Sequence, residues 1–230
     1  MICAYNKDLI KYNLQRIRKL DQPIAKIISE NTPKSGINLT AQKAKGLPSE
    51  VWLSKGAMIK LTTNINKPAG LTNGAEGYVR YIIYAENTKP PELPRMVIVH
   101  FPQYIGKMSY LGMDKCYPIV PIERKWGKNK SRKMIPIRLG WASTIHSVQG
   151  LSIKKKVIVN LGLREFTPNL TYTALTRVSR FEQLAFWPKL PDFHPRFTGI
   201  KRTQSFKMRM EYAKKEEKSN EQFDSEDEFE

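Results

Sequence analysis

The sequence predicts an α/β fold with a parallel sheet that is interrupted by a small antiparallel β module. Three observations lead to this prediction. An apolar strand followed by a helical pattern begins the chain, several short β-rich runs fill its middle, and an apolar strand flanked by helical patterns lies near its end. Continuous apolar runs are typical of strands in parallel sheets, whereas short strands spaced by turn residues are typical of small barrels or sandwiches.

The first twenty residues hold one strand and one helix of the predicted α/β part. Residues 1–5, MICAY, are expected to form a short buried strand. Residues 6–20 are expected to form an amphipathic helix, because apolar residues recur there at helical spacing. Residues 21–50 are mixed in character and interrupted by prolines, so no element is assigned to them.

The middle of the chain is rich in β-forming residues. Four runs are expected to be strands, at residues 57–63, 77–84, 95–101 and 133–139, separated by Gly, Pro and Asn. The dipeptide Asn73-Gly74 is a turn signal, because both residue types tolerate positive φ. Since no helical pattern separates these runs, they predict a small antiparallel barrel or sandwich.

Beyond Gly140 the pattern is again that of an α/β fold. Residues 141–149 are expected to form a short helix, 156–161 an apolar strand, 170–178 a helix and 183–187 a strand. The predicted domain organisation therefore has four parts. These are a first α/β segment at 1–47, a β-barrel insertion at 48–135, a second α/β segment at 136–202, and a charged tail at 203–230 expected to fray and be disordered.

Charge is the strongest global property of the chain. Lys plus Arg number 39 against 21 Asp plus Glu, which gives +18, and the last twelve residues hold six acids and no base. The first 218 residues thus carry 39 basic residues against 15 acidic ones, which is a net charge of +24. This excess favours a polyanionic partner, with nucleic acid before an acidic membrane surface. No apolar run approaches the roughly 20 residues that span a bilayer, so we expect no membrane partner.

Two cysteines and the absence of phosphate-binding motifs limit the chemistry further. Cys3 and Cys116 are isolated, which indicates buried reduced thiols rather than a disulfide or a zinc site. We expect no metal ligands in this chain. It contains no Gly-x-x-x-x-Gly-Lys-Ser/Thr sequence, and hence no P-loop, and no paired carboxylates at a strand end to hold magnesium.

The segment WASTIHSVQG, residues 141–150, is unusually polar for a core element. In a helix, Ile145 and Val148 would point inward while Thr144 and Ser147 would share another side. Hydroxyls and an imidazole suit phosphate oxygens, to which they donate hydrogen bonds without selecting a base. Taken alone, the segment is better explained as a capped helix with a core histidine.

The segment LTYTALTRVSR, residues 170–180, places an arginine at the end of a predicted helix. Leu170, Ala174 and Val178 share its buried face, and Arg177 follows Thr176. Arg177 can balance the helix C-terminus as a surface charge. Alternatively, its guanidinium can reach a terminal phosphate across a cleft, because it is permanently charged and binds two phosphate oxygens at once.

Taken together, the two segments resemble motifs V and VI of superfamily-one helicases, and they are most similar to the RecD-like branch that contains the Pif-type DNA helicases. That family carries Thr-Ile-His-Lys-Ser-Gln-Gly, a strand, and Tyr-Val-Ala-Leu-Ser-Arg. The residues that match are Thr144, His146, Gln149, Gly150, Tyr172, Ala174, Leu175 and Arg177. The departures are Ser147 for lysine, Val148 for serine and Thr176 for serine.

The resemblance extends over most of residues 1–200, in order. YNKDLIKYN is similar to a family stretch that has threonine where this chain has Tyr5. LSKGAMIKLTTNINKPAGLTNGAEGYV and LAFWPKLPDFHPRFTGI are similar to the family's segments before motif V and after motif VI. An ordered match of this length is more specific than either motif.

The resemblance implies a fold and a set of partners. Such enzymes have two RecA-like domains, with ATP between them and single-stranded DNA across both. This chain would be the second RecA-like domain with a small β-barrel inserted. It would work with a P-loop domain that lies upstream in a longer chain or on a separate chain, and ATP and Mg²⁺ would be its cofactors, with magnesium held mainly by that other domain.

The resemblance also implies roles for individual residues. Arg177 would be the catalytic arginine that touches the γ-phosphate. Gln149 and Gly150 would lie on the nucleotide side of motif V. The residues expected to contact DNA are Thr144, His146 and Ser147 in motif V, and Asn64 and Asn73 in the inserted barrel. Ser147 in place of lysine removes one phosphate contact.

The predicted function is the C-terminal portion of an ATP-dependent 5′-to-3′ DNA helicase that is inactive by itself. Two other hypotheses stay open at this point. One is a non-catalytic nucleic-acid-binding module, such as a degenerate relic of a mobile-element helicase. The other is an RNA-coating protein of ribosomal type, which charge alone suggests but which gives no reason for the ordered motifs.

Overall fold

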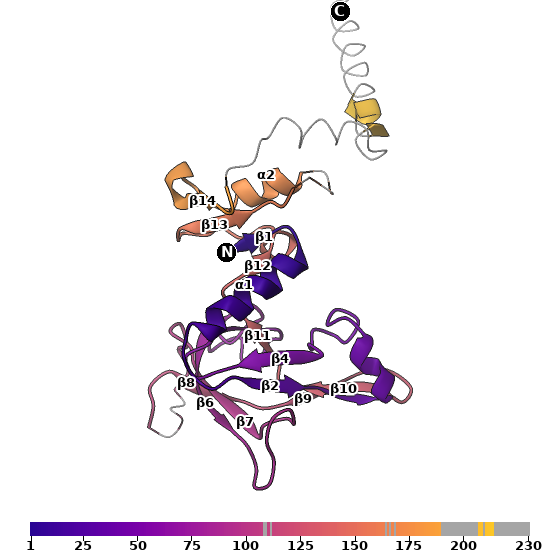
Figure 1. Ribbon diagram of the computed structural model, residues 1–230, viewed down its shortest axis with the longest axis vertical. Coiled ribbons are helices and arrows are strands. Elements are labelled where there is room, and N and C mark those ends of the chain that lie inside the picture. The colour runs from indigo at the N-terminus through magenta and orange to yellow at the C-terminus, as the bar shows by residue number, and fades with distance from the viewer. Residues whose placement is uncertain are drawn as a thin grey trace, which may run out of the picture. The chain divides into compact units, whose positions relative to one another are not determined.

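The computed structural model describes residues 1–107, 110, 112–163, 165, 167, 169–189, 207–208 and 210–213. The chain forms two compact units (Figure 1). One, the parallel-sheet unit, comprises Met1–Leu9 and Ser143–Glu230, and the other, the antiparallel unit, comprises Ile10–Ala142. The second unit thus interrupts the first in sequence, while the domain boundaries set out above stay a prediction.

Two further expectations concern the whole chain. Within the described ranges, no helix has the length and apolar character that crossing a membrane requires. The predicted tail at 203–230 lies mostly outside the described residues, and the six that are described there are helical.

The parallel-sheet unit is built on four parallel strands in the order β12-β1-β13-β14. Their bounds are β1 (Ile2–Cys3), β12 (Ser143–Thr144), β13 (Val157–Asn160) and β14 (Leu184–Phe186). The first strand lies inside the sheet, because Ile2 is in register with both Ser143 and Val159. The predicted strands at 1–5, 156–161 and 183–187, and the parallel α/β class, are confirmed.

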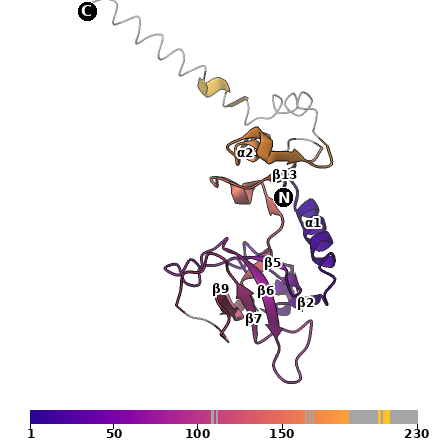
Figure 2. The same cartoon turned by 90° about the vertical axis from the view of Figure 1, so that its left-hand side faces the viewer.

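Helix α2 (Leu170–Leu175) packs apolar side chains against this sheet. It places Leu170 and Ala174 in a buried cluster with Val157 and Val159 of β13. In Figure 2, α2 lies next to β13. The helix is shorter than the predicted 170–178, since it ends before Arg177.

The predicted helix at 141–149 is wrong. The segment forms β12 and then a single 3-10 turn, η2 (His146–Val148). The backbone pairs with β1 instead of with itself: the Ser143 N–H donates to the Met1 carbonyl at 2.9 Å, and the Ile145 N–H to the Cys3 carbonyl at 3.0 Å. Ile145 and Val148 are nevertheless buried, as the sequence predicts.

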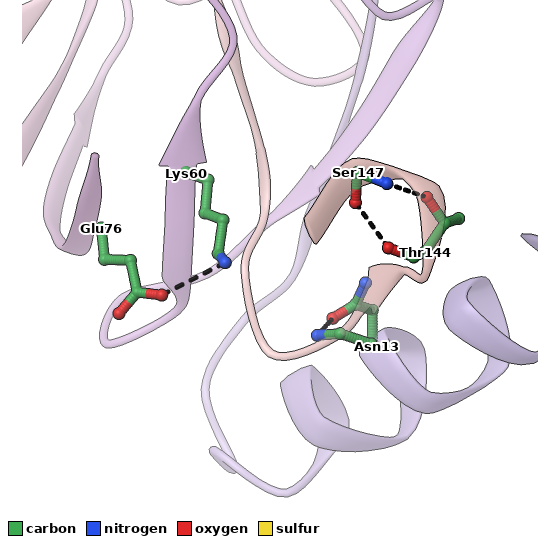
Figure 3. Close-up of polar contacts among 6 residues, drawn as sticks. Asn13, Lys60, Glu76, Thr144 and Ser147 are labelled. Carbon is green, nitrogen blue, oxygen red and sulfur yellow. Dashed lines mark hydrogen bonds and ion pairs between the residues drawn. The ribbon is translucent and has the colours of Figure 1, made fainter. Parts of the chain in front are cut away.

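The long N-terminal helix agrees with its prediction. Helix α1 (Asn6–Arg18) buries Asn13 and Ile17 along one side. Asn13 is buried because its side chain has a partner: its Oδ1 accepts the Ala142 N–H at 3.0 Å (Figure 3). A buried amide that forms this bond avoids the cost of an unsatisfied polar group.

The antiparallel unit contains three sheets, ordered β11-β5-β6-β7-β8, β3-β10-β9 and β2-β4. Their bounds are β2 (Ala25–Ile28), β3 (Glu30–Thr32), β4 (Glu50–Leu53), β5 (Met58–Leu61), β6 (Glu76–Ile83), β7 (Met96–His100), β8 (Cys116–Ile119), β9 (Ile122–Gly127), β10 (Lys130–Met134) and β11 (Ile137–Leu139), with the 3-10 helix η1 (Lys34–Asn38). Lys60 on β5 and Glu76 on β6 stand opposite each other as a 3.2 Å ion pair (Figure 3). Among the described strand pairings none joins β11 to β8, so a closed barrel is not shown.

The predicted strand at 133–139 is in fact two strands in different sheets. Pro136 separates β10 from β11 and has no N–H to donate to a ladder. Lys133 on β10 is paired with Glu30 and Glu123, whereas Ile137 on β11 is paired with Leu61. The proline therefore marks the position where the chain passes from one sheet to the next.

A fully buried arginine organises the loop between β3 and β4. Arg132 on β10 is 0% exposed. Its Nε donates to Asn31 Oδ1 at 2.8 Å, its Nη1 to the Leu47 carbonyl at 2.8 Å, and its Nη2 to the carbonyls of Gly36 at 2.7 Å and Leu39 at 3.0 Å. These acceptors are all neutral, and burial lowers the pKa of the Arg132 guanidinium.

Replacing Gly77 by alanine is expected to destabilise the five-stranded sheet by about 1–3 kcal/mol, through overpacking. A Cβ at Gly77 on β6 would lie 2.6 Å from Val99 Cγ1 and 2.8 Å from the Phe101 ring, and both side chains are buried. Urea unfolding measures the loss. The matched control is Gly127→Ala on β9, where the nearest atom is 3.6 Å away; equal stability of the two variants would contradict the packing argument.

Candidate functional site

Arg177 is held by three hydrogen bonds to neutral oxygens just beyond the end of α2. Its Nε donates to the Thr173 carbonyl at 2.8 Å, its Nη1 to the Leu151 carbonyl at 3.1 Å, and its Nη2 to Thr176 Oγ1 at 2.9 Å. The side chain is half-buried. A guanidinium has five N–H donors, so two are not used by these bonds, and no carboxylate pairs with Arg177 in the described part of the chain.

The segment after Gly150 is bound to the segment after α2 at three points. Besides the bond from Arg177 to Leu151, the Ile153 N–H donates to the Arg177 carbonyl at 2.7 Å. Gln183 Nε2 donates to the Lys154 carbonyl at 2.9 Å. Arg177 is therefore fixed, through both backbone and side chain, to the residues that directly follow Gly150.

Gln149 and Gly150 lie at an exposed turn that brings the chain to Leu151. Gln149 follows η2 with an exposed side chain, and Gly150 adopts φ +78°. This conformation costs glycine little, and a Cβ there would meet nothing within 4 Å. The structure thus brings Gln149, Gly150 and Arg177 together at one place, although they are distant in sequence.

Thr144 and Ser147 are bonded to each other at the surface of the same unit (Figure 3). The Ser147 N–H donates to Thr144 Oγ1 at 3.3 Å, and Ser147 Oγ donates to the Thr144 carbonyl at 2.8 Å. Ser147 thereby uses its one hydroxyl proton internally, while His146 beside it is exposed. Three of the residues predicted to contact nucleic acid thus lie together, with Thr144 half-buried and His146 and Ser147 exposed.

A carboxylate that the sequence analysis missed holds the start of α2. Glu165 accepts the Thr171 N–H at 3.2 Å through Oε1 and the Thr171 hydroxyl through Oε2. Thr171 is fully buried. An acidic residue just before a helical pattern is a recognised start signal, so Glu165 could have been identified as the group that positions the helix before Arg177.

Asn64 and Asn73, the other two residues predicted to contact nucleic acid, belong to the antiparallel unit. Asn64 Oδ1 accepts the Asn73 N–H at 2.8 Å, and both residues are exposed. Gly74 adopts φ +90°, so the predicted turn at Asn73-Gly74 is confirmed. Asn64 therefore shapes this turn from nine positions away.

The two cysteines do not form a nucleophilic or metal site. Burial raises the pKa of the Cys3 thiol to about 11 and also raises that of Cys116, so both are protonated at neutral pH and are poor nucleophiles. Both are buried and free, as expected. Over the described ranges, no three His, Cys, Asp or Glu side chains are grouped as metal ligands would be.

Comparison with curated proteins gives relatives of a single kind. The chain is 26% identical to "ATP-dependent DNA helicase PIF1" of Rattus norvegicus over 195 residues, which is 84% of this chain and 27% of that protein. It is 30% identical to "ATP-dependent DNA helicase PIF6" of Trypanosoma brucei brucei over 189 residues, which is 80% of this chain and 22% of that protein. The chain thus spans about a quarter of the length of these relatives. No family model matches it.

Solved structures show the same fold. The Pif1 helicase of Candida albicans superposes with a TM-score of 0.60 at 17% identity, over 83% of this chain and 46% of that one. The Bacteroides Pif1 bound to single-stranded DNA superposes with a TM-score of 0.57 at 18% identity, over 87% of this chain and 44% of that one. Together with the parallel sheet, these matches support a RecA-like α/β fold.

Proposed function

Because this chain is a homologue of the Pif1 DNA helicases and fits the C-terminal part of such an enzyme, we propose that it supplies the second RecA-like half of an ATP-dependent DNA helicase. In this proposal the P-loop half lies upstream in a longer chain or on a separate chain. The observation that carries the proposal is Arg177, fixed beside Gly150 with two N–H groups that its three hydrogen bonds do not use.

The residues present fit the phosphate of a nucleotide at this point. Arg177 is held in place before any ligand arrives, so little ordering cost is left for binding, and preorganised positive charge is how proteins stabilise a transferring phosphoryl group. Gln149 offers an exposed amide at the adjoining turn. Bound ATP supplies the free energy of the cycle, and we assign magnesium to the P-loop half, since no carboxylate cluster in the described residues of this chain suits it.

In the proposed cycle, closure of the two halves brings Arg177 to the γ-phosphate, and hydrolysis releases the contact. Thr144, His146 and Ser147 face the DNA backbone from one turn, and Ser147 gives up its bond to the Thr144 carbonyl when it donates to a phosphate. The antiparallel unit takes the place of the inserted barrel and guides the strand with the Asn64–Asn73 turn. Movement would proceed in the 5′-to-3′ sense.

Measuring ATP hydrolysis with the two halves apart and together tests this function. The 230-residue chain alone is expected to show no turnover, and the chain joined to its P-loop half is expected to show turnover stimulated by single-stranded DNA. The matched control carries an inactivated P-loop lysine in the other half. If DNA binds and yet no pairing yields turnover, the chain is a non-catalytic nucleic-acid-binding module instead.

A further inference from the structure

A basic pocket with an aromatic wall lies in the antiparallel unit, and its lining includes none of the residues proposed above to contact nucleotide or DNA. It has a volume of about 770 Å³, within the range of small-ligand sites. Its walls come from the loop between β3 and β4 and from the β9–β10 hairpin. The residues that line it are Pro33, Ser35, Gly36, Leu39, Lys43, Trp126, Gly127, Lys128 and Lys130.

A β-bulge between β9 and β10 sets the direction of the Trp126 side chain. On β10, Lys130 pairs with Gly127 and the next residue, Ser131, pairs with Lys125, so Trp126 is the extra residue of the bulge. A bulge changes the direction in which its side chain points. Trp126 is half-buried and lines the pocket instead of joining the core of the unit.

The lining is cationic and contains no acid. Lys43, Lys128 and Lys130 are all exposed, and none pairs with a carboxylate among the described ion pairs. The β9–β10 hairpin as a whole is also positively charged, because residues 124–133 hold six bases and no acid. Lys130 lies alongside Gly127, with its Cδ 3.6 Å from where a Cβ would be, which places its chain next to the bulge.

The buried Arg132 adds positive charge next to two residues that line the pocket. It donates to the carbonyls of Gly36 and Leu39, which are lining residues. Gly36 lies within η1 and Leu39 follows its end, and the Gly36 carbonyl also accepts the Leu39 N–H at 3.0 Å. Because the guanidinium is bonded to these two carbonyls and no carboxylate pairs with it among the described ion pairs, this side of the pocket favours an anion.

We propose that this pocket binds single-stranded nucleic acid, with one base stacked on Trp126 and the flanking phosphates on Lys43, Lys128 and Lys130. An aromatic face beside a positively charged groove is how proteins hold single strands without selecting sequence. A duplex does not offer a free base face, and an acidic peptide does not offer a ring to stack. The proposal concerns the antiparallel unit, so its test is independent of the ATP-hydrolysis test of the proposed function.

Binding of a fluorescent 15-nucleotide oligothymidylate to the 230-residue chain, followed by anisotropy, tests the stacking. Trp126→Leu keeps an apolar side chain but removes the ring, and is expected to weaken binding by roughly 5- to 160-fold. Trp126→Phe is expected to restore most of the affinity. Binding of a 15-base-pair duplex is expected to be unchanged in Trp126→Leu. Equal loss for duplex and single strand, or no loss for either, would overturn the proposal.

The salt dependence of oligonucleotide binding tests whether the three lysines contact phosphates. In the triple variant Lys43→Gln, Lys128→Gln and Lys130→Gln, the plot of log affinity against log salt is expected to be less steep by about 2, because each phosphate contact on a single strand contributes about 0.7. The matched control removes three exposed lysines outside the pocket, Lys11, Lys55 and Lys89. If the control flattens the slope as much, the binding is diffuse and the pocket is not the site.

Discussion

Replacing Arg132 by methionine is expected to lower the free energy of unfolding by about 3–5 kcal/mol. The change leaves the Leu47, Gly36 and Leu39 carbonyls and the Asn31 amide without their charged donor. Each buried acceptor left unsatisfied costs about 1–3 kcal/mol, partly offset because a charge no longer has to be desolvated. Arg132→Lys is expected to recover little of the lost stability, since a compact ammonium group cannot replace a planar guanidinium with five N–H donors.

Urea unfolding followed by tryptophan fluorescence measures this effect, because three of the four tryptophans, Trp52, Trp126 and Trp141, lie in the antiparallel unit. The control is Lys133→Met, the next residue on β10, whose ion pair with Glu30 spans 3.5 Å at the exposed surface. Such a pair contributes less than about 1 kcal/mol. An Arg132→Met chain as stable as the parent would show that the loop does not depend on the guanidinium.

Replacing Arg177 by alanine in the assembled ATPase is expected to reduce turnover on the order of 10³- to 10⁵-fold, which is the effect of losing an arginine that stabilises phosphoryl transfer. Affinity for single-stranded DNA is expected to be unchanged. The fall is expected in kcat with little change in KM for ATP, since the contact would be made only when the cleft is closed. Steady-state ATPase assays and DNA anisotropy on the same preparations measure both.

Two variants separate catalysis from structure at this site. Arg177→Lys keeps the positive charge but loses the planar guanidinium that binds two phosphate oxygens at once. It is expected to recover only a small part of kcat. Lys154→Gln removes a nearby exposed charge while its carbonyl still accepts from Gln183, so turnover is expected to be unchanged. If Arg177→Ala lowers turnover only in proportion to a loss of folded protein, then Arg177 is a structural residue.

The parallel-sheet unit was largely predictable because its signals are local. Apolar runs at 1–5 and 156–161 led to β1 and β13. The helical spacing at 6–20 led to α1, of which only the first residues, up to Leu9, belong to this unit. The segment at 141–149 was mispredicted because its amphipathic spacing fits a helix, while the partner that decides its structure is β1, which lies at the other end of the sequence. Tertiary pairing overrode local preference there.

In the antiparallel unit the sequence pointed to strands but not to their partners. The runs at 57–63, 77–84 and 95–101 became β5, β6 and β7, while β2 and β3 formed in the stretch at 21–50 left without assignment, and β4 begins at its last residue. Nothing in the sequence around Arg132 distinguishes it from its exposed basic neighbours, and it is buried because its acceptors come from residues 31–47. The hydrogen bond from Arg177 to the Leu151 carbonyl could not be predicted from local sequence patterns either, because the two residues are 26 positions apart.

The position of β1 has a consequence for how the protein is made. Its partners β12 and β13 begin about 140 residues later, and at a translation speed of about 5–20 residues per second that delay is on the order of ten seconds. Residues 10–142 are contiguous and can complete their sheets on the ribosome in this interval. Ile2 and Cys3 must wait unpaired until Ser143 and Val157 emerge, so chaperones that shield this strand during synthesis are expected to raise the yield of the natively folded chain.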